Sequence, residues 1–291
     1  MNGILLIDKP EELSSAAVVR LVKKTYRVEK IGHLGTLDPF ASGLLPLCVG
    51  TGTKIAQFLI AERKAYSGTI RLGVETDTMD RTGTVTRTAS PPHYQDETLN
   101  SLETRFLGEY WQTPPMYSAL KRNGTPLYKL ARRGVVVERE PRKVCIERFS
   151  LAPLEPDLLG FSLTCSKGTY VRVLASDIGN ALGCGAHLVT LRRTAVGEFA
   201  VDDALSLQQL LEEQVDISAF LLSPAQAMRH YQTVHISSEM VTKLRQGRQD
   251  MLSCLPNATY EQAIAALLDP GGELVAVVEN QQNQWRLARV L

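Results

Sequence analysis

Apolar residues recur along the chain with two spacings, one typical of strands and one typical of helices. The apolar run at residues 3–8 is followed by Lys9-Pro10, which predicts a buried strand that ends in a turn. A helix capped by Ser14 or Ser15 is expected next. Its apolar stripe, at the i, i+3, i+4 spacing, consists of Val18, Leu21 and Val22.

The same spacings predict further elements up to residue 182. Helices are expected at residues 53–62, 96–107 and 169–182, and strands at residues 66–72 and 160–165. Residues 31–46 hold so many glycines and prolines that they predict a long structured loop, and residues 75–96 predict turns. Helices and strands mix without a regular βαβ rhythm, which favours the α+β fold class.

A second, smaller domain is expected at the C-terminal end. The Ser223-Pro224 step and the end of an acidic stretch mark a boundary, so that the domains are predicted to cover residues 1–228 and 229–291. The smaller domain is predicted to contain a helix at residues 237–246, a Gly271-Gly272 turn and two strands at residues 273–279 and 284–291. It is therefore expected to be rich in β structure.

The composition is that of an ordinary globular protein. Of the 291 residues, 44% are hydrophobic and 22% are charged, which excludes a disordered chain. The five cysteines are odd in number and scattered, so neither a disulfide framework nor a zinc site is indicated. No apolar run approaches the roughly 18 residues of a membrane span, and the N-terminus is unlike a signal peptide. We expect a soluble, cytoplasmic protein with no membrane partner.

The net charge of +1 hides two oppositely charged stretches. Residues 121–143 contain eight basic and two acidic side chains, a local charge of +6, whereas residues 198–228 contain six acidic side chains and no lysine or arginine. This asymmetry suits a protein with one face toward phosphates. Two solvated faces that balance each other explain the charges equally well.

Several familiar patterns are incomplete. The segment Gly50–Lys54 has glycines and a lysine but lacks the spacing of a phosphate-binding loop. The five histidines form no pair with the spacing of zinc ligands, so no metal is expected. Asp77 and Asp80 offer carboxylates, but turns capped by their own side chains explain them better than a cation site.

One segment holds a single carboxylate in a rigid frame. Residues 32–46 place Asp38 between glycines and directly before Pro39, and a catalytic acid needs such fixed placement. Taken alone, an aspartate before a proline is more often a turn or cap residue. The whole pattern changes this interpretation.

Residues 32–46 resemble a motif of the TruB family of tRNA pseudouridine synthases, G-H-x-G-x-L-D-P-x-A-x-G-x-L-P, at every specified position. The resemblance continues, in the family's order, up to about residue 195. Its other blocks are residues 3–10, 64–68, 115–121, 165–172 and 183–194.

This resemblance implies a fold, a reaction and a partner. The fold is a pseudouridine synthase core, with a mixed, mainly antiparallel sheet flanked by helices, followed by a β-rich PUA-like RNA-binding domain. Residues 121–143 resemble the family's thumb, which closes over the RNA. The activity is isomerisation of uridine to pseudouridine in the T-loop of tRNA, at position 55 in family terms. The reaction needs no cofactor and no metal, and we expect the protein to be a monomer that binds the T stem-loop.

The resemblance also assigns roles to single residues. Asp38 is the catalytic residue, acting as nucleophile or as base toward the sugar. Arg172 pairs with Asp38, and Tyr66 stacks on the flipped uracil. Four more residues are expected to bind the substrate: Lys9, His33, Tyr170 and Leu191. Without the resemblance, Arg172 lies off the apolar stripe of its helix and is expected on the surface, and Tyr66 is expected to be a core residue.

One departure and two alternatives remain. The family usually has a glycine two residues after Lys9-Pro10, where this chain has Glu12; if that glycine takes positive φ, the turn is expected to differ. One alternative function is an RNA-binding or tRNA-folding chaperone on the same scaffold, in which Asp38 is incidental. The other is the same reaction on a uridine in another RNA.

Overall fold

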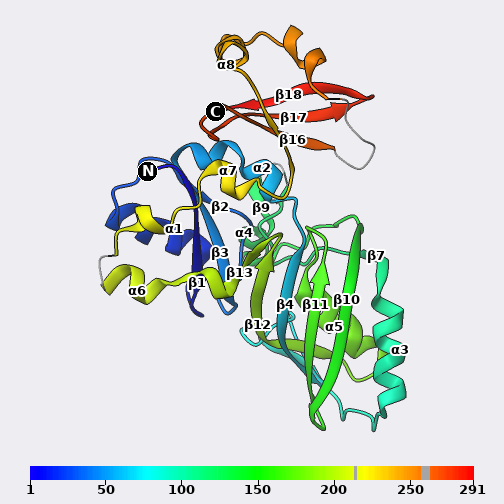
Figure 1. Cartoon of the computed structure of the whole chain (residues 1–291). Helices are drawn as coiled ribbons and strands as arrows, with labels where there is room; N and C mark the ends of the chain where they lie inside the picture. The colour runs from blue at the N-terminus through cyan, green and yellow to red at the C-terminus, as the bar shows by residue number, and fades with distance from the viewer. Residues whose placement is uncertain (123, 213–214, 257–262) are drawn as a thin grey trace. The chain divides into compact units, whose positions relative to one another are not determined.

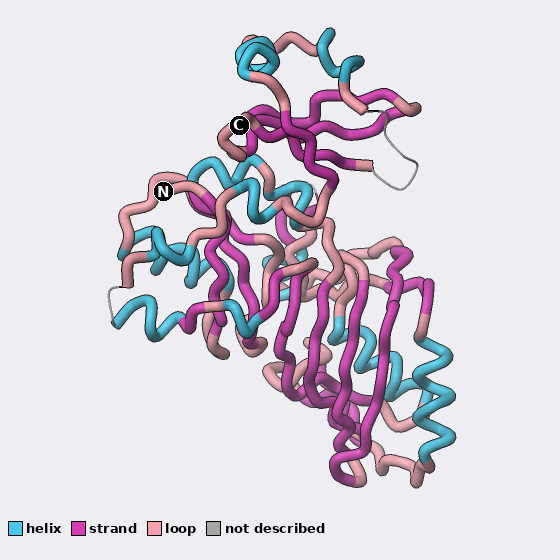
Figure 2. Tube along the Cα trace, viewed as in Figure 1, coloured by secondary structure: helices cyan, strands magenta, loops and turns pink. Residues whose placement is uncertain are grey.

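The computed structural model describes residues 1–122, 124–212, 215–256 and 263–291 (Figures 1 and 2). The chain forms two compact units. Unit 1 comprises residues 1–37, 44–61 and 198–291, and unit 2 comprises residues 38–43 and 62–197. The boundary expected after residue 228 lies within unit 1 and stays a prediction. Glu213, one of the six acidic side chains of residues 198–228, lies outside the described residues.

Unit 1 begins with a strand and a helix, as the sequence predicts. Its elements before residue 230 are β1 (Gly3–Lys9), α1 (Ser15–Thr25), β2 (Ile31–His33), the larger part of β3 (Ser42–Val49), η1 (Gly50–Lys54), α2 (Ala56–Leu59), β13 (Phe199–Ala200), η2 (Val201–Asp203), β14 (Leu205–Ser206), α6 (Leu207–Glu212), η3 (Ile217–Phe220) and α7 (Pro224–Ala227). Here β1 lies between β14 and β3, parallel to β14, and β2 pairs with β3 in antiparallel fashion.

Three sequence predictions for this part need correction. Ser14 caps α1 as expected and Val18 and Val22 are buried, but Leu21 is 36% exposed because it lies at the margin of the buried face. Residues 31–46 are only partly a loop, since β2 pairs with the end of β3 and leaves residues 34–41 irregular. The helix expected at residues 53–62 is reduced to α2, which follows η1 directly.

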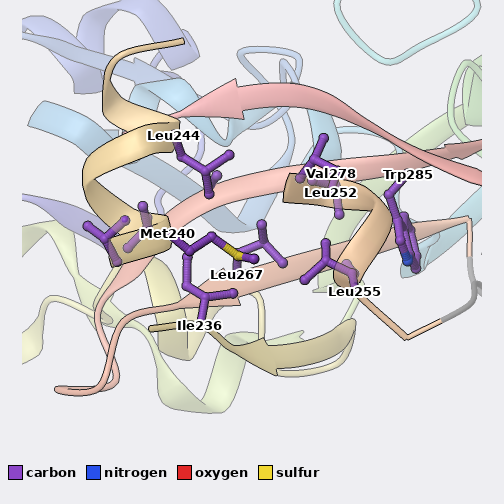
Figure 3. Packing of buried hydrophobic residues seen from close by; sticks show 12 residues of the cluster. Ile236, Met240, Leu244, Leu252, Leu255, Leu267, Val278 and Trp285 are labelled. Carbon is purple, nitrogen blue, oxygen red and sulfur yellow. The ribbon is translucent and has the colours of Figure 1, made fainter. Parts of the chain in front are cut away.

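The C-terminal part of unit 1 is a small sheet covered by a helix. Its elements are β15 (Gln232–His235), α8 (Ser238–Arg245), η4 (Asp250–Cys254), β16 (Ile264–Leu268), β17 (Leu274–Gln281) and β18 (Gln284–Val290), with the strands in the order β15-β16-β17-β18. Figure 3 shows Leu244 of α8 and Leu252 of η4 near Leu267 and Val278, which belong to the sheet. The helix, the Gly271-Gly272 turn and the last two strands confirm the prediction, whereas β15 and β16 were not predicted.

Unit 2 is an antiparallel sheet with helices packed on it. Its elements are β4 (Lys64–Leu72), β5 (Val74–Thr76), β6 (Val85–Thr88), α3 (Asp96–Phe106), β7 (Gly108–Gln112), β8 (Lys121–Arg122), β9 (Thr125–Pro126), α4 (Leu127–Ala131), β10 (Arg142–Glu155), β11 (Leu158–Cys165), α5 (Val171–Ala181) and β12 (Ala186–Val196). The strand order is β12-β4-β11-β10-β7. Figure 1 shows α5 behind these strands and α3 beside β7 and β10.

The mixture of helices with a mainly antiparallel sheet confirms the α+β class. The first residues of β3, which belong to unit 2, add a parallel pairing with β12. Among the helices of the described ranges, none has both the length and the apolar character needed to span a membrane.

The turn after β1 contains the departure from the family pattern. Glu12 adopts a φ of 66°, in the left-handed region that favours glycine. The turn therefore takes a glycine-type conformation with glutamate in place. We expect Glu12→Gly to stabilise the protein by about 1 kcal/mol, because glycine carries no Cβ penalty there. Urea denaturation measures the change. The control is Glu11→Gly, which replaces a residue outside the left-handed region and should be neutral or destabilising; an equal gain from both would contradict this explanation.

Candidate active site

Hydrogen bonds hold the backbone of the loop on both sides of Asp38. In unit 1, the Ser15 hydroxyl accepts a hydrogen bond from the Leu37 N–H at 2.8 Å and donates to the Leu37 carbonyl oxygen at 3.1 Å. In unit 2, the Ala41 N–H donates to the Asp38 carbonyl oxygen at 3.1 Å. Phe40 and Ala41 are buried. The backbone of Asp38 is therefore fixed, as the sequence motif predicts.

After this loop the chain enters β3, which begins very close to the backbone of β12. Gly43 lies opposite Arg193 where β3 begins beside β12, and its φ is +101°. A Cβ added to Gly43 would lie 2.3 Å from the Arg193 carbonyl oxygen. Only glycine fits here without displacing backbone, which explains the glycine five residues after the aspartate.

Asp38 and Arg172 form the ion pair that the resemblance implies. Arg172 Nε donates to Asp38 Oδ2 at 2.9 Å, and Arg172 Nη2 donates to Asp38 Oδ1 at 3.2 Å. The Arg172 side chain is 4% exposed, whereas that of Asp38 is 34% exposed. The bidentate geometry fixes the orientation of the carboxylate, which stays partly exposed to solvent.

Arg172 is buried because its other donors are also satisfied. Its Nη1 donates to the Thr78 carbonyl oxygen at 3.0 Å, and its Nη2 donates to that of Tyr117 at 2.8 Å. The expectation of a surface arginine off the apolar stripe is therefore wrong. The first turn of α5 is buried all round, so the amphipathic pattern does not describe it.

Asp80 is a second carboxylate beside the guanidinium. Its Oδ1 accepts hydrogen bonds from the Thr78 hydroxyl at 2.8 Å and from the Thr82 N–H at 2.9 Å, which confirms the interpretation of a capped turn. Its Oδ2 lies 3.6 Å from Arg172 Nε, and its side chain is 5% exposed. This second role has no signal of its own in the sequence, because the turn alone accounts for an aspartate between threonines.

Tyr66 and Leu191 lie on neighbouring strands of the unit 2 sheet. Tyr66 of β4 pairs with Arg193 of β12, and Gly68 pairs with Leu191, which puts Tyr66 and Leu191 on one face of the sheet. Tyr66 is 8% exposed and Leu191 is 6% exposed. Burial raises the pKa of the Tyr66 phenol above its ordinary value, so the hydroxyl keeps its proton at neutral pH.

Arg193 is a buried cation that the sequence analysis did not single out. Its side chain is fully buried beside Tyr66, and burial lowers its pKa. A hydrogen bond joins the two side chains. Its place in the Leu191-Arg192-Arg193 run is the only sequence signal, because two consecutive arginines on a strand are usually solvated.

The remaining predicted residues lie in two places. Tyr170 is half-buried, directly before α5, and is two residues from Arg172. His33 is half-buried at the end of β2 in unit 1.

Lys9 is fully buried at the end of β1, also in unit 1, and its ammonium donates to the carbonyl oxygens of Pro10 and Leu13, each at 2.7 Å. These contacts support the turn after β1, and the role of Lys9 in substrate binding stays a prediction.

Within the described ranges, no three His, Cys, Asp or Glu side chains gather as a metal site would require. The Asp38 carboxylate is instead oriented by guanidinium nitrogens of Arg172, and its side chain is 34% exposed. The class of site that this geometry fits is a candidate aspartate-dependent active site, with the aspartate oriented by a buried arginine.

Comparisons with known proteins agree with this class. Residues 23–171 match the family model described as "TruB family pseudouridylate synthase (N terminal domain)", and residues 172–227 match "tRNA pseudouridylate synthase B C-terminal domain". A relative named tRNA pseudouridine synthase B from Syntrophotalea carbinolica is 42% identical over 279 residues, which are 94% of this chain and 90% of the relative. One of the same name from Clostridium kluyveri is 37% identical and covers 100% of this chain and 99% of its own length. The chain belongs to the TruB family of pseudouridylate synthases.

Solved structures show the same fold. A chain of the Cbf5-Nop10-Gar1 complex superposes with a TM-score of 0.74 at 23% identity, over 99% of this chain and 84% of that one. A chain of an H/ACA ribonucleoprotein bound to a substrate RNA containing 2'-deoxyuridine superposes with a TM-score of 0.73 at 22% identity, over the same shares. These similarities support the fold.

Proposed function

We propose that this protein isomerises uridine to pseudouridine in the T-loop of tRNA, at the position numbered 55 in the family. The observation that carries the proposal is the bidentate pair between Asp38 and the buried Arg172, inside the family's catalytic motif. The relatives that match nearly the whole chain carry the name of this activity.

The reaction requires one bond to break and another to form. The N1–C1′ bond of uridine is cleaved, the uracil turns, and C5 bonds to C1′; the hydrogen leaves C5 and N1 gains one, so no atom is lost overall. Asp38 acts on the sugar as nucleophile or as base, and must be ionised for either role. The Arg172 guanidinium favours that ionised form and holds both oxygens in place.

The target uridine must leave its stack before Asp38 reaches the sugar. Flipping a base costs a few kcal/mol, and stacking on an aromatic ring returns about 1–3 kcal/mol. Tyr66 is the proposed stacking partner, and Leu191 on the same sheet face lines the uracil site. Tyr170 lies beside the base, and His33 contacts the RNA near the vacated position.

The basic stretch at residues 121–143 is the proposed thumb. Among its described residues, β8 pairs with β9, α4 follows, and an irregular segment leads to β10, whose first residues Arg142 and Lys143 complete the stretch. Arg132 and Arg133, at the end of α4, are exposed to solvent. Their guanidinium groups are available to phosphates of the T stem.

The double variant Arg132→Gln/Arg133→Gln is therefore expected to weaken tRNA binding and to flatten its salt dependence. Each lost phosphate contact reduces the slope of log K against log salt by about 0.7–0.9, so two lost contacts reduce it by about 1.5. Filter binding over a series of salt concentrations measures the slope. Arg20→Gln/Arg27→Gln, on the α1 region of unit 1, serves as the charge-matched control. An unchanged slope in the thumb variant would contradict this role.

Two experiments separate the proposal from its alternatives. Assaying a T stem-loop minihelix beside an rRNA fragment distinguishes the T-loop from another RNA uridine: pseudouridine should form in the minihelix. A chaperone would refold tRNA equally well with Asp38 or with asparagine at that position and would form no pseudouridine. Pseudouridine in the rRNA fragment alone, or in neither RNA, would overturn the proposal.

Three further features belong to this proposal. The C-terminal residues 229–291 act as a PUA-like module that adds tRNA affinity, which their compact β sheet supports. The protein works as a monomer. It acts in the cytoplasm, where tRNA is processed.

A further inference from the structure

Gln112 links the end of an edge strand to Tyr170, the residue directly before α5. It ends β7, the outermost strand of the unit 2 sheet, and is 2% exposed. Its Oε1 accepts a hydrogen bond from the Tyr170 N–H at 2.7 Å, and its Nε2 donates to the Tyr170 carbonyl oxygen at 3.1 Å. The amide thus pairs with both backbone groups of Tyr170, as a neighbouring strand would.

The second proton of the Gln112 amide is also satisfied. Nε2 donates to the hydroxyl of Tyr110, which lies two residues earlier on β7. All the strong hydrogen-bonding groups of this buried side chain therefore have partners, and the orientation of the amide is fixed. Because all its partners are in place, the buried Gln112 amide fixes the position of the Tyr170 backbone to which it is hydrogen-bonded.

The backbone of Tyr170 is paired with the Gln112 amide, while its own side chain interacts with that of Ser118. Tyr170 occupies the N-cap position without a side-chain capping hydrogen bond. Its carbonyl oxygen already accepts from the N–H groups of Val173 and Leu174, so movement of Tyr170 shifts the whole first turn of the helix. Arg172 is in that first turn, and its Nε and Nη2 hold Asp38.

We infer that Gln112 is a positioning residue for pseudouridine formation: its amide fixes the backbone of Tyr170 and, through the first turn of α5, the direction from which Arg172 holds Asp38. The hydrogen bonds of the Gln112 side chain go to Tyr110 and Tyr170, so it acts on Asp38 only through them. This inference rests on the proposed function, because it assigns a supporting role to the same site. A displacement of about 1 Å at a catalytic group can cost about 100-fold in rate.

The test compares Gln112→Leu with Gln112→Glu on a tRNA substrate under saturating conditions. Gln112→Leu removes both bonds to Tyr170 and is expected to lower kcat about 10- to 100-fold, with KM for tRNA within about threefold of the native value. Gln112→Glu keeps nearly the same side-chain size and shape. When protonated, its carboxyl offers one donor and one acceptor to Tyr170; when ionised, it repels the Tyr170 carbonyl oxygen.

The pH profile then separates positioning from a general structural effect. Burial raises the pKa of a carboxyl group, so the introduced Glu should lose its proton only above the ordinary range. The ratio of kcat for Gln112→Glu to native kcat should therefore rise as pH falls, whereas the ratio for Gln112→Leu should stay constant. Parallel pH profiles for the two variants would overturn the inference.

A matched control lowers the stability of the protein and leaves the hydrogen bonds between Gln112 and Tyr170 in place. Val144 of β10 pairs with Tyr110 and is 4% exposed, so Val144→Ala should lower the melting temperature and leave kcat unchanged. If Val144→Ala and Gln112→Leu lower kcat equally at equal loss of stability, Gln112 has only a structural role and the inference fails.

A readout without turnover keeps this test separate from that of the proposed function. The NMR resonance of the Arg172 Nε–H, assigned with Arg172→Lys, reports the bond to Asp38 in the protein without RNA. It should shift in Gln112→Leu and stay in place in Val144→Ala. A resonance unmoved in Gln112→Leu would overturn the role of Gln112, whereas a native protein that forms no pseudouridine would overturn the proposed function.

Discussion

Replacing Asp38 with asparagine is expected to abolish pseudouridine formation, with a loss of at least about 1,000-fold in single-turnover rate. Asparagine has nearly the same shape but is neutral, so it acts neither as nucleophile nor as base toward the sugar. The loop backbone is held by Ser15 and Ala41, and Asp80 remains beside Arg172 as a second carboxylate. The variant should therefore still fold and bind tRNA with nearly native affinity, and it should lose less stability than a variant without Arg172, because Asp38 is 34% exposed. Rates measured under single turnover, together with a binding constant from the same preparation, test both parts.

The control is the same substitution in a surface ion pair of unit 2. Asp157 accepts a hydrogen bond from Arg71 at 2.6 Å, and both side chains are more than a third exposed. Asp157→Asn should cost little stability and leave the rate intact. If Asp38→Asn kept more than about a tenth of the native rate, the carboxylate would not be the catalytic group.

Replacing Arg172 with methionine is expected to remove activity and to destabilise the protein. The methionine fills similar volume but leaves Asp38 without its bidentate partner and leaves the buried Asp80 beside an apolar side chain. Removing one partner from a buried ion pair typically costs about 3–5 kcal/mol. Urea denaturation should show a loss of that order, and the single-turnover rate should fall by at least about 100-fold.

The double variant Arg172→Met/Asp80→Asn separates the two effects. It removes the buried unpaired charge, so it should recover part of the lost stability while activity stays absent. Arg71→Met, at the surface pair, is the matched control and should cost less than about 1 kcal/mol. A double variant no more stable than Arg172→Met would show that Asp80 does not interact with the guanidinium.

The sequence predicted the local elements better than the contacts between distant segments. The amphipathic spacing and Ser14 were sufficient for α1, and the apolar alternation was sufficient for β4. It did not predict β2, because a three-residue strand next to glycines has no pattern of its own and exists only through its pairing with β3. β15 was not predicted for the same reason, because it pairs with β16, about 30 residues later in the sequence.

The candidate site shows the same distinction. Asp38 was identifiable because its motif lies within one continuous segment of 15 residues. Three features of the site were not identifiable: the burial of Arg172, the second role of Asp80 and the amide of Gln112. Each depends on groups between 55 and 134 residues away in sequence, which only the folded chain brings together. Helical periodicity misplaced Arg172, because the first turn of α5 is buried on every side and has no solvent-facing stripe.

The most direct measurement of the central claim is tritium release from tRNA that carries [5-³H]uridine. Bonding of C5 to C1′ must expel the hydrogen at C5, so release reports the new carbon–carbon bond itself. The native protein is expected to release tritium up to one equivalent per tRNA, and none from a tRNA whose T-loop target uridine is replaced by cytidine. A native protein that binds tRNA tightly but releases no tritium would contradict the assignment of this chain as a tRNA pseudouridine synthase.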